Sequence, residues 1–323
     1  MIPPMLLNIL FIIIGVVLVL WGADRLTEGA SAVARRMNVP EIVIGLTIVA
    51  AGTSAPELFV SLVSALKGTP DMAVGNVIGS NIFNCLLIVG CAAMVAPMNI
   101  SRSTVTKDIP FAVASSLLLA VICMDGWQSL SLHGNTISRL DGVWMLLGFA
   151  AFMYYTFLVS KESPTPLDEH SSPSMPIWKG LLWVAVGLGC LIVGSNLFVG
   201  SASAVAAELG VSESIIGLTI VAGGTSLPEL ATSVVAARKG QSAIAIGNVI
   251  GSSVFNILLI LGLTAVICPM QIDGITIVDV SLMLLSVLLI WLFSYTKLTV
   301  ARWEGAVLTV IFFSYMGWLL YNI

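Results

Sequence analysis

Two glutamates, Glu57 and Glu229, lie deep in long apolar segments, and each follows a proline in a repeated motif. The motif reads "GTSAPE" at 52–57 and "GTSLPE" at 224–229. If these segments cross a membrane, each carboxylate costs about 2.5 to 3.5 kcal/mol to insert and therefore needs a partner. No Lys or Arg falls at comparable depth in any predicted span. We therefore expect a bound cation to neutralise both glutamates.

The prolines add further oxygen atoms around the glutamates. Proline lacks a backbone donor and clashes with the preceding turn, so we predict helix breaks at 52–56 and 224–228. The breaks should release carbonyl groups near Ala50 and Ala222, which must then find protein, water or ions. The hydroxyl groups beside the breaks belong to Thr53, Ser54, Thr225 and Ser226. Such hard oxygen ligands suit Ca²⁺ and Na⁺, suit Mg²⁺ less well, and argue against Zn²⁺ or Cu⁺.

A second repeated motif supplies side-chain amides. It reads "GNVIGSNIFN" at 75–84 and "GNVIGSSVFN" at 247–256. Its polar residues recur every four positions and so share one helical face. They are Asn76, Ser80 and Asn84 in the first copy and Asn248, Ser252 and Asn256 in the second. The serines and the deeper asparagines are predicted to join the site, whereas Asn76 and Asn248 are equally suited to packing helices together.

The composition indicates that both motifs belong to an integral membrane protein. Of 323 residues, 58% are hydrophobic and only 9% are charged, with a mean hydropathy of +1.05. Long apolar runs recur along the whole chain, which favours helices over the short alternating strands of a barrel. We predict an all-α integral membrane fold with ten transmembrane helices. Their expected extents are 5–24, 40–66, 72–96, 109–125, 139–159, 178–206, 211–237, 243–268, 276–294 and 303–321.

The two halves of the chain are copies of each other. Residues 45–67 match 217–239 without gaps at an offset of 172, with 16 of 23 positions identical. A unit of five spans is odd, so the second copy must enter the membrane from the opposite side. We predict two inverted five-helix repeats, with broken helices 2 and 7. The expected organisation is a first repeat at 1–159, a cytoplasmic linker at 160–177 and a second repeat at 178–323.

Lys and Arg residues predict the orientation. Only Lys67 and Arg139 fall in the connections after the even-numbered spans, and ten others fall in the alternate set. We therefore place that alternate set and the linker in the cytoplasm and both termini outside. The expected location is the cell (inner) membrane.

At these motifs the sequence resembles the calcium/cation antiporter superfamily, in particular its prokaryotic sodium/calcium exchanger branch. The resemblance covers the whole chain and implies a cation site centred on Glu57 and Glu229. It further implies support from Thr53, Thr225 and the carbonyls of Ala50 and Ala222. The surrounding residues that complete the sodium sites would be Ser54, Ser80, Asn84, Ser226, Ser252 and Asn256. Potassium-dependent relatives carry Asp where this chain has Asn256, which favours potassium-independent exchange.

The predicted function is antiport of Ca²⁺ for Na⁺ by alternating access, in which one cluster faces each side in turn. Spans 1 and 6 are predicted to slide as the gate, and the charges of Asp24, Arg25 and Glu28 are interpreted as a solvated or interfacial cluster. Protons should compete for two carboxylates buried together, because desolvation and mutual repulsion disfavour their charged forms. We expect no cofactor, no nucleic acid and no protein partner beyond the lipid bilayer and the transported ions.

Three alternatives remain open from the residues. A calcium/proton or potassium-dependent exchanger could use the same scaffold. A passive cation channel is less favoured, because channel filters usually surround a pore rather than a compact central site. An enzyme is least favoured, because the sequence has no H-E-x-x-H, G-x-S-x-G or P-loop pattern.

Overall fold

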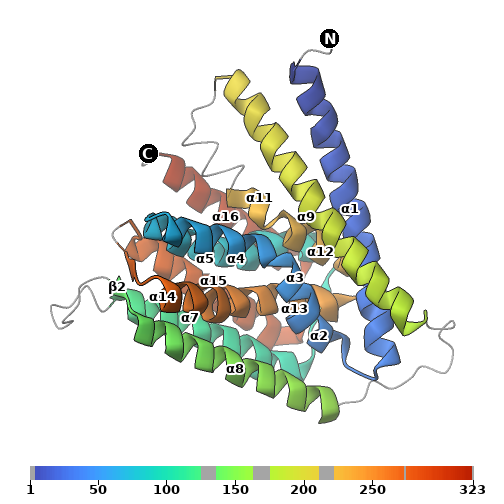
Figure 1. The fold of residues 1–323 in the computed structure, drawn as a ribbon. Coiled ribbons are helices and arrows are strands. Elements are labelled where there is room, and N and C mark those ends of the chain that lie inside the picture. The colour runs from blue at the N-terminus through green and yellow to red at the C-terminus, as the bar shows by residue number, and fades with distance from the viewer. Residues whose placement is uncertain (1–3, 125–135, 163–174, 211–221, 273, 322–323) are drawn as a thin grey trace.

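The computed structural model describes residues 4–124, 136–162, 175–210, 222–272 and 274–321, which are almost entirely helical (Figure 1). The helices of the first half are α1 Pro4–Arg36, α2 Glu41–Ile44, η1 Gly45–Val49, α3 Ala50–Thr53, α4 Ala55–Leu66, α5 Pro70–Ile82, η2 Phe83–Ile88, α6 Val89–Val95, η3 Thr104–Asp108, α7 Ile109–Met124 and α8 Arg139–Glu162. Those of the second half are α9 Ile177–Glu208, α11 Ala222–Thr225, α12 Leu227–Arg238, α13 Ser242–Val254, η5 Phe255–Leu261, α14 Gly262–Ile267, α15 Ile277–Lys297 and α16 Arg302–Tyr321.

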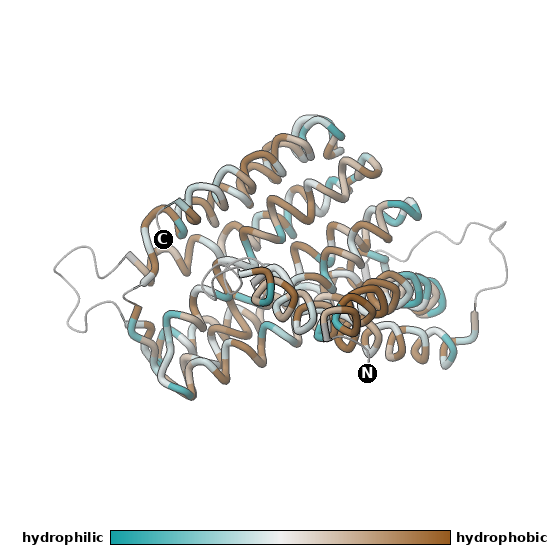
Figure 2. The backbone as a smooth tube through the Cα atoms, turned by 90° about the horizontal axis from the view of Figure 1, so that it is seen from above, coloured by the Kyte–Doolittle hydropathy of each residue, from teal (hydrophilic) through white to brown (hydrophobic). Residues whose placement is uncertain are grey.

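The helices confirm a multi-pass membrane architecture. Among the described residues, eight helices are long and apolar enough to cross a membrane, and a bent pair at 41–66 makes a ninth. Hydrophobic stretches run along most of them (Figure 2). The predicted span at 211–237 and the linker at 160–177 lie partly outside the described residues. The tenth helix and the full inverted repeat therefore stay predictions.

The first helix is longer than the sequence predicts. The expected span ended at residue 24, but α1 continues to Arg36 because its second half packs against protein. Leu26, Ala30 and Ala34 are fully buried there. Burial of this apolar stripe carries the helix past the charged residues at which the hydropathy pattern ends.

Helices α1 and α9 run side by side and cross the rest of the molecule obliquely (Figure 1). Glycines on each helix allow the two backbones to approach closely. A Cβ atom added at Gly22 would lie 2.8 Å from the carbonyl oxygen of Gly187, which is too close for any side chain. Small residues at such a seam permit close helix packing in a membrane. The same closeness recurs one heptad away on either side.

The helices that carry the "GNVIGS" motif form the centre of the molecule. The most apolar windows of Pro70–Val95 and Ser242–Ile267 are 72% and 78% buried, whereas the other full-length spans reach at most 44%. Gly251 permits this packing, because a Cβ added there would lie 2.7 Å from the Cβ of Ala50. The motif's small residues therefore bring α13 against the broken helix at η1 and α3.

Several contacts occur in matching pairs at the rim of the bundle. Tyr155 donates a hydrogen bond to Asp108 at 2.8 Å, and Tyr315 donates one to Asp279 at 2.5 Å. Four short strands also join the halves in two antiparallel pairs, β1 with β4 and β2 with β3. Their bounds are β1 Met98–Asn99, β2 Thr136–Ile137, β3 Met270–Gln271 and β4 Thr299–Val300.

Candidate cation-binding site

The two predicted helix breaks are present, and each places a glutamate in the first turn of a new helix. The first half bends by 46° between α3 and α4, at Ser54. Ser226 has nearly the same backbone angles, with φ −89° and ψ 8° against −83° and 8° at Ser54. A proline is tolerated in the first turn because its missing N–H has no helical partner there. The first turn also favours a negative charge, so the local sequence suits Glu57 and Glu229.

One detail of the first break differs from expectation. The prediction that Pro56 releases the carbonyl of Ala50 is wrong, because the N–H of Ser54 still donates to it at 2.9 Å. The carbonyl four residues before a proline is the one that loses its donor, and in the second half this is Gly224. Its oxygen accepts a hydrogen bond from Ser195 of α9 at 2.6 Å. The Thr53 hydroxyl also lies 3.4 Å from the Ala50 carbonyl oxygen, so this carbonyl has two hydrogen-bond donors.

The glutamates are held by serines from the opposite half of the chain. Ser54 Oγ donates to Glu229 Oε1 at 3.0 Å, and Ser226 Oγ donates to Glu57 Oε1 at 3.0 Å. Both carboxylates are 1% exposed. This exchange of hydrogen bonds brings the two helix breaks together in one buried place.

One oxygen atom of each carboxylate has no hydrogen-bond partner in the described part of the chain. Glu57 Oε2 and Glu229 Oε2 are buried without a hydrogen bond, and among the described residues neither glutamate pairs with Lys or Arg. Buried groups in this condition normally have an unseen partner such as an ion or water. Other atoms that are buried without a hydrogen-bond partner in the described part of the chain include Ser252 Oγ, Asn256 Oδ1 and both amide atoms of Asn84.

Of the remaining predicted residues, Thr53, Thr225 and Ala222 belong to the short helices that lead into the two breaks. Thr53 is fully buried, and its hydroxyl is 3.1 Å from both the Val49 carbonyl and Asn248 Oδ1. Ser80 is 4% exposed, on α5. Thr225 ends α11 next to the second break, and Ala222 begins the same helix.

Sequence reasoning left Asn76 and Asn248 open, and the structure gives them a defined contact. Asn76 Nδ2 donates to the backbone carbonyl of Glu57 at 3.2 Å, and Asn248 Nδ2 donates to that of Glu229 at 3.3 Å. Each amide also donates to a serine on the glutamate's helix, at 2.9 Å and 3.0 Å. These asparagines therefore position the backbone of each glutamate.

Three residues of this network were missed. The serines bound by the asparagines are Ser61 and Ser233, which repeat at the same offset of 172 and could have been found from it. Asn81 accepts a hydrogen bond from Asn256 Nδ2 at 3.3 Å. Its counterpart in the repeat is Ser253, so the duplication carried no signal for Asn81.

The fold and site define a multi-pass membrane protein with a buried carboxylate pair suited to cations. Comparison with known proteins finds similarity to cation exchangers. A family model described as "Sodium/calcium exchanger protein" matches residues 7–158 and 179–321. The putative antiporter CaxA of Alkalimonas amylolytica is 37% identical, over 96% of this chain and 98% of its own. The sodium/calcium exchanger MaX1 of Methanosarcina acetivorans is 32% identical, over 97% and 99%.

A solved structure is similar over almost the whole chain. It is the sodium-calcium exchanger NCX_Mj soaked with Na⁺ and Ca²⁺, which is 30% identical and superposes with a TM-score of 0.83 over 96% of this chain and 98% of its own. The chain belongs to the sodium/calcium exchanger family, which is a family of transporters rather than enzymes.

Proposed function

We propose that this protein exchanges Ca²⁺ for Na⁺ across the cell (inner) membrane at the site formed by Glu57 and Glu229. The observation that carries the proposal is the pair of crossed serine–glutamate hydrogen bonds around carboxylate oxygens that have no protein cation. Calcium prefers several oxygen ligands from carboxylates, carbonyls and amides, and these surround the site.

The charge of the site supports competition between the two ions. Two carboxylates balance one Ca²⁺ or two Na⁺, so either ion type can neutralise the same buried cluster. An empty cluster would expose two charges to a dry interior, which disfavours movement of the unloaded protein. Any sodium ion beyond two would carry net charge across the membrane in each cycle. Asn84 and Asn256 add no third carboxylate, which supports exchange without potassium.

The proposed ligands are oxygen atoms of the two repeated motifs and of the helical turns that precede the two breaks. They belong to Glu57, Glu229, Thr53, Thr225, Ala50, Ala222, Ser54, Ser226, Ser80, Ser252, Asn84 and Asn256. No cofactor is proposed. Protons compete with the cations for the carboxylates.

The proposed mechanism is alternating access on a scaffold of ten helices in two inverted repeats, at 1–159 and 178–323, with a cytoplasmic linker at 160–177 and both termini outside. Helices α1 and α9 slide together against the rest as the gate. Their close glycine seam supports movement as one unit, because the two backbones pack on each other more intimately than on the bundle.

The test is uptake of radiolabelled calcium into proteoliposomes loaded with Na⁺ and diluted into media with or without Na⁺ at fixed pH. We expect uptake only with an outward sodium gradient, and none in Glu57→Gln. Glu304→Gln is the matched control, because Glu304 is a buried glutamate that caps α16 away from the site. Uptake driven by a pH gradient alone would show that protons rather than sodium are the coupling ion. A calcium current that needs neither a sodium gradient nor a pH gradient would indicate a channel.

A further inference from the structure

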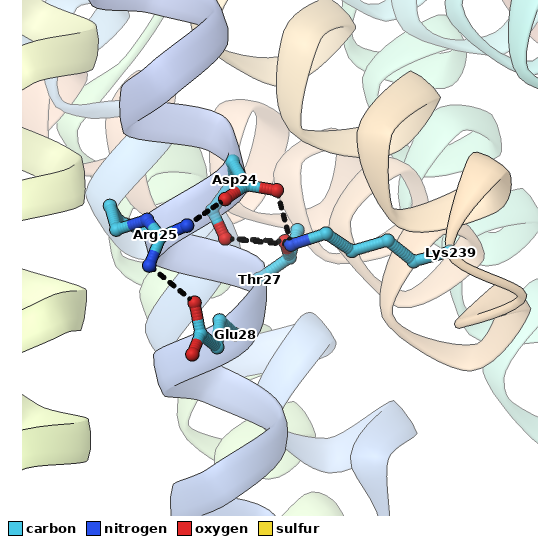
Figure 3. Close-up of polar contacts among 5 residues, drawn as sticks. All are labelled: Asp24, Arg25, Thr27, Glu28 and Lys239. Atoms are coloured by element: carbon cyan, nitrogen blue, oxygen red, sulfur yellow. Dashed lines mark hydrogen bonds and ion pairs between the residues drawn. The ribbon is translucent and has the colours of Figure 1, made fainter.

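A charged cluster outside the cation site joins the gate helix α1 to the helix that carries Glu229 (Figure 3). Lys239, at the end of α12, lies with its Nζ 2.6 Å from Asp24 Oδ1. The same ammonium donates to the Asp24 carbonyl at 2.9 Å and to Thr27 Oγ1 at 3.2 Å. Three oxygen atoms of α1 therefore hold one cation from α12.

The rest of the cluster is balanced in charge. Arg25 pairs with Asp24 and lies 2.7 Å from Glu28, and its guanidinium also lies over the ring of Trp183 on α9 at 5.3 Å. Two acids and two bases thus sum to zero. The cluster was expected to be solvated or interfacial, and the side chains of Asp24 and Lys239 are 35% and 31% exposed. Arg25 would still neutralise Asp24 if Lys239 were replaced.

The repeat-related positions of the other half do not form such a cluster in the described part of the chain. At the offset of 172, Lys239 corresponds to Lys67, but Asp24 corresponds to Asn196. Lys67 and Asn196 are both exposed, and in the described residues Lys67 makes no ion pair. The counterparts of Arg25, Thr27 and Glu28 are Leu197, Val199 and Gly200.

The packing is one-sided in the same way. Helix α1 packs extensively against α12, whereas in the described part of the chain α9 makes little contact with α4, its counterpart. In a transporter with two identical inverted halves, the two end states would have equal free energy, because each is the other turned over. Residues that differ between the halves must therefore decide which state is more populated.

We propose that the Lys239–Asp24 ion pair is a one-sided brace that stabilises the state in which α1 and α12 are in contact. It thereby sets how strongly the exchanger favours opening to one face of the membrane. This inference rests on the proposed alternating access of α1 and α9. Helix α12 couples the brace to the site, since Glu229 lies in its first turn and Lys239 caps its C-terminal end.

The brace makes a quantitative prediction for Lys239→Gln. Half-exposed ion pairs and their hydrogen bonds shift an equilibrium by about threefold to tenfold. Apparent affinity from each face scales with the fraction of protein open to that face. In the proposed state, the contact of α1 with α12 closes the site to one face of the membrane. On that face the half-saturating Ca²⁺ concentration should therefore fall about threefold to tenfold, and on the opposite face it should change about twofold or less.

The measurement uses sodium-driven calcium uptake in right-side-out and inverted membrane vesicles, so that each face is titrated separately. Lys239→Arg keeps the charge and should behave as the original protein. Lys67→Gln is the matched control, because it removes the same charge at the repeat-related position, where no ion pair is present. Two outcomes would overturn the brace. In one, Lys239→Gln changes the maximal uptake rate on both faces but leaves the half-saturating Ca²⁺ concentrations unchanged. In the other, Lys239→Gln and Lys67→Gln behave alike.

Hydrogen exchange of the purified full chain separates this inference from the proposed function. In Lys239→Gln, amides at the end of α12 and in the facing part of α1 should exchange faster, while Lys239→Arg and Lys67→Gln should leave them unchanged. If the original protein shows no sodium-dependent uptake, the proposed function fails. The hydrogen-exchange rates alone then test whether the Lys239–Asp24 ion pair holds α1 against α12. Unchanged exchange in Lys239→Gln would reject it.

Discussion

The two halves of the molecule are nearly interchangeable at the cation site and different at the faces where α1 and α9 meet the bundle. At the site, each half gives one serine to the other's glutamate at the same 3.0 Å distance. At the periphery, Lys239 has an acidic partner, whereas Lys67 makes no ion pair with any residue that the structure describes. The proposed binding site is therefore built symmetrically, whereas the contacts proposed to favour one conformation are not.

The difference separates the residues proposed to bind the ions from those proposed to set the relative stability of the two open states. A site that must hold the same ion while open to either side is served by equal contributions from both halves. The relative stability of the two open states depends on contacts that one state makes and the other lacks. Residues far from the ion can therefore set sidedness without changing the ligands.

The largest expected effect tests the equivalence of the two glutamates. Glu57→Gln and Glu229→Gln should each lower sodium-driven calcium uptake at least about a hundredfold, because removing one partner of a buried ion pair costs about 3 to 5 kcal/mol. Uptake into proteoliposomes measures the loss, and a thermal melt in detergent checks folding. Normal transport by either variant would show that one half alone forms the site.

The crossed serines should give the next largest effect. Ser54→Ala and Ser226→Ala each remove a hydrogen bond to a carboxylate, worth about 1.5 to 3 kcal/mol, so calcium affinity should fall about tenfold to a hundredfold. Calcium titration of initial uptake rates measures it. Ser115→Ala is the control, because that buried serine donates only to its own helix, at Phe111. Unequal losses of calcium affinity in Ser54→Ala and Ser226→Ala would show that the two halves do not contribute equally to the site.

A third carboxylate should alter which ions are coupled. Asn256→Asp raises the formal charge of the site from two to three, and a charge about 4 Å from a cation interacts by about 4 kcal/mol at the effective dielectric of proteins. We expect a folded protein whose uptake gains a dependence on protons or potassium. Uptake across a pH series with and without K⁺ measures this, with Asn84→Asp as the repeat-related comparison. An unchanged profile in both variants would contradict the role of these asparagines.

The smallest expected effect concerns an asymmetry between the halves at Asn81. Asn81→Ser removes the hydrogen bond from Asn256, and a neutral bond of about 0.5 to 1.5 kcal/mol corresponds to about twofold to tenfold in calcium affinity. The mirror change Ser253→Asn should have less effect, because Ser253 donates to Val249 of its own helix rather than to Asn84. Isothermal titration with Ca²⁺ compares the two, and equal effects would show that Asn81 does not position Asn256.

The two helix breaks were predictable from the sequence because their motif is duplicated. A repeated proline and glutamate in apolar sequence signals a broken helix with a costly charge, and the structure contains both breaks. Asn81 escaped detection because its counterpart is Ser253. The wrong expectation for the Ala50 carbonyl arose because the helix continues by one more hydrogen bond, to Ser54, before it bends.

The sequence by itself determined the membrane environment, the helical class, the two breaks and the two buried carboxylates, since all of these follow from local hydropathy, proline geometry and the repeat. Only the tertiary structure decided which serine meets which glutamate, that α1 runs on to Arg36, and that Lys239 reaches Asp24. These depend on contacts between residues about 170 to 215 positions apart. Local pattern carries no information about such pairs, because it is the packing of whole helices that brings them together.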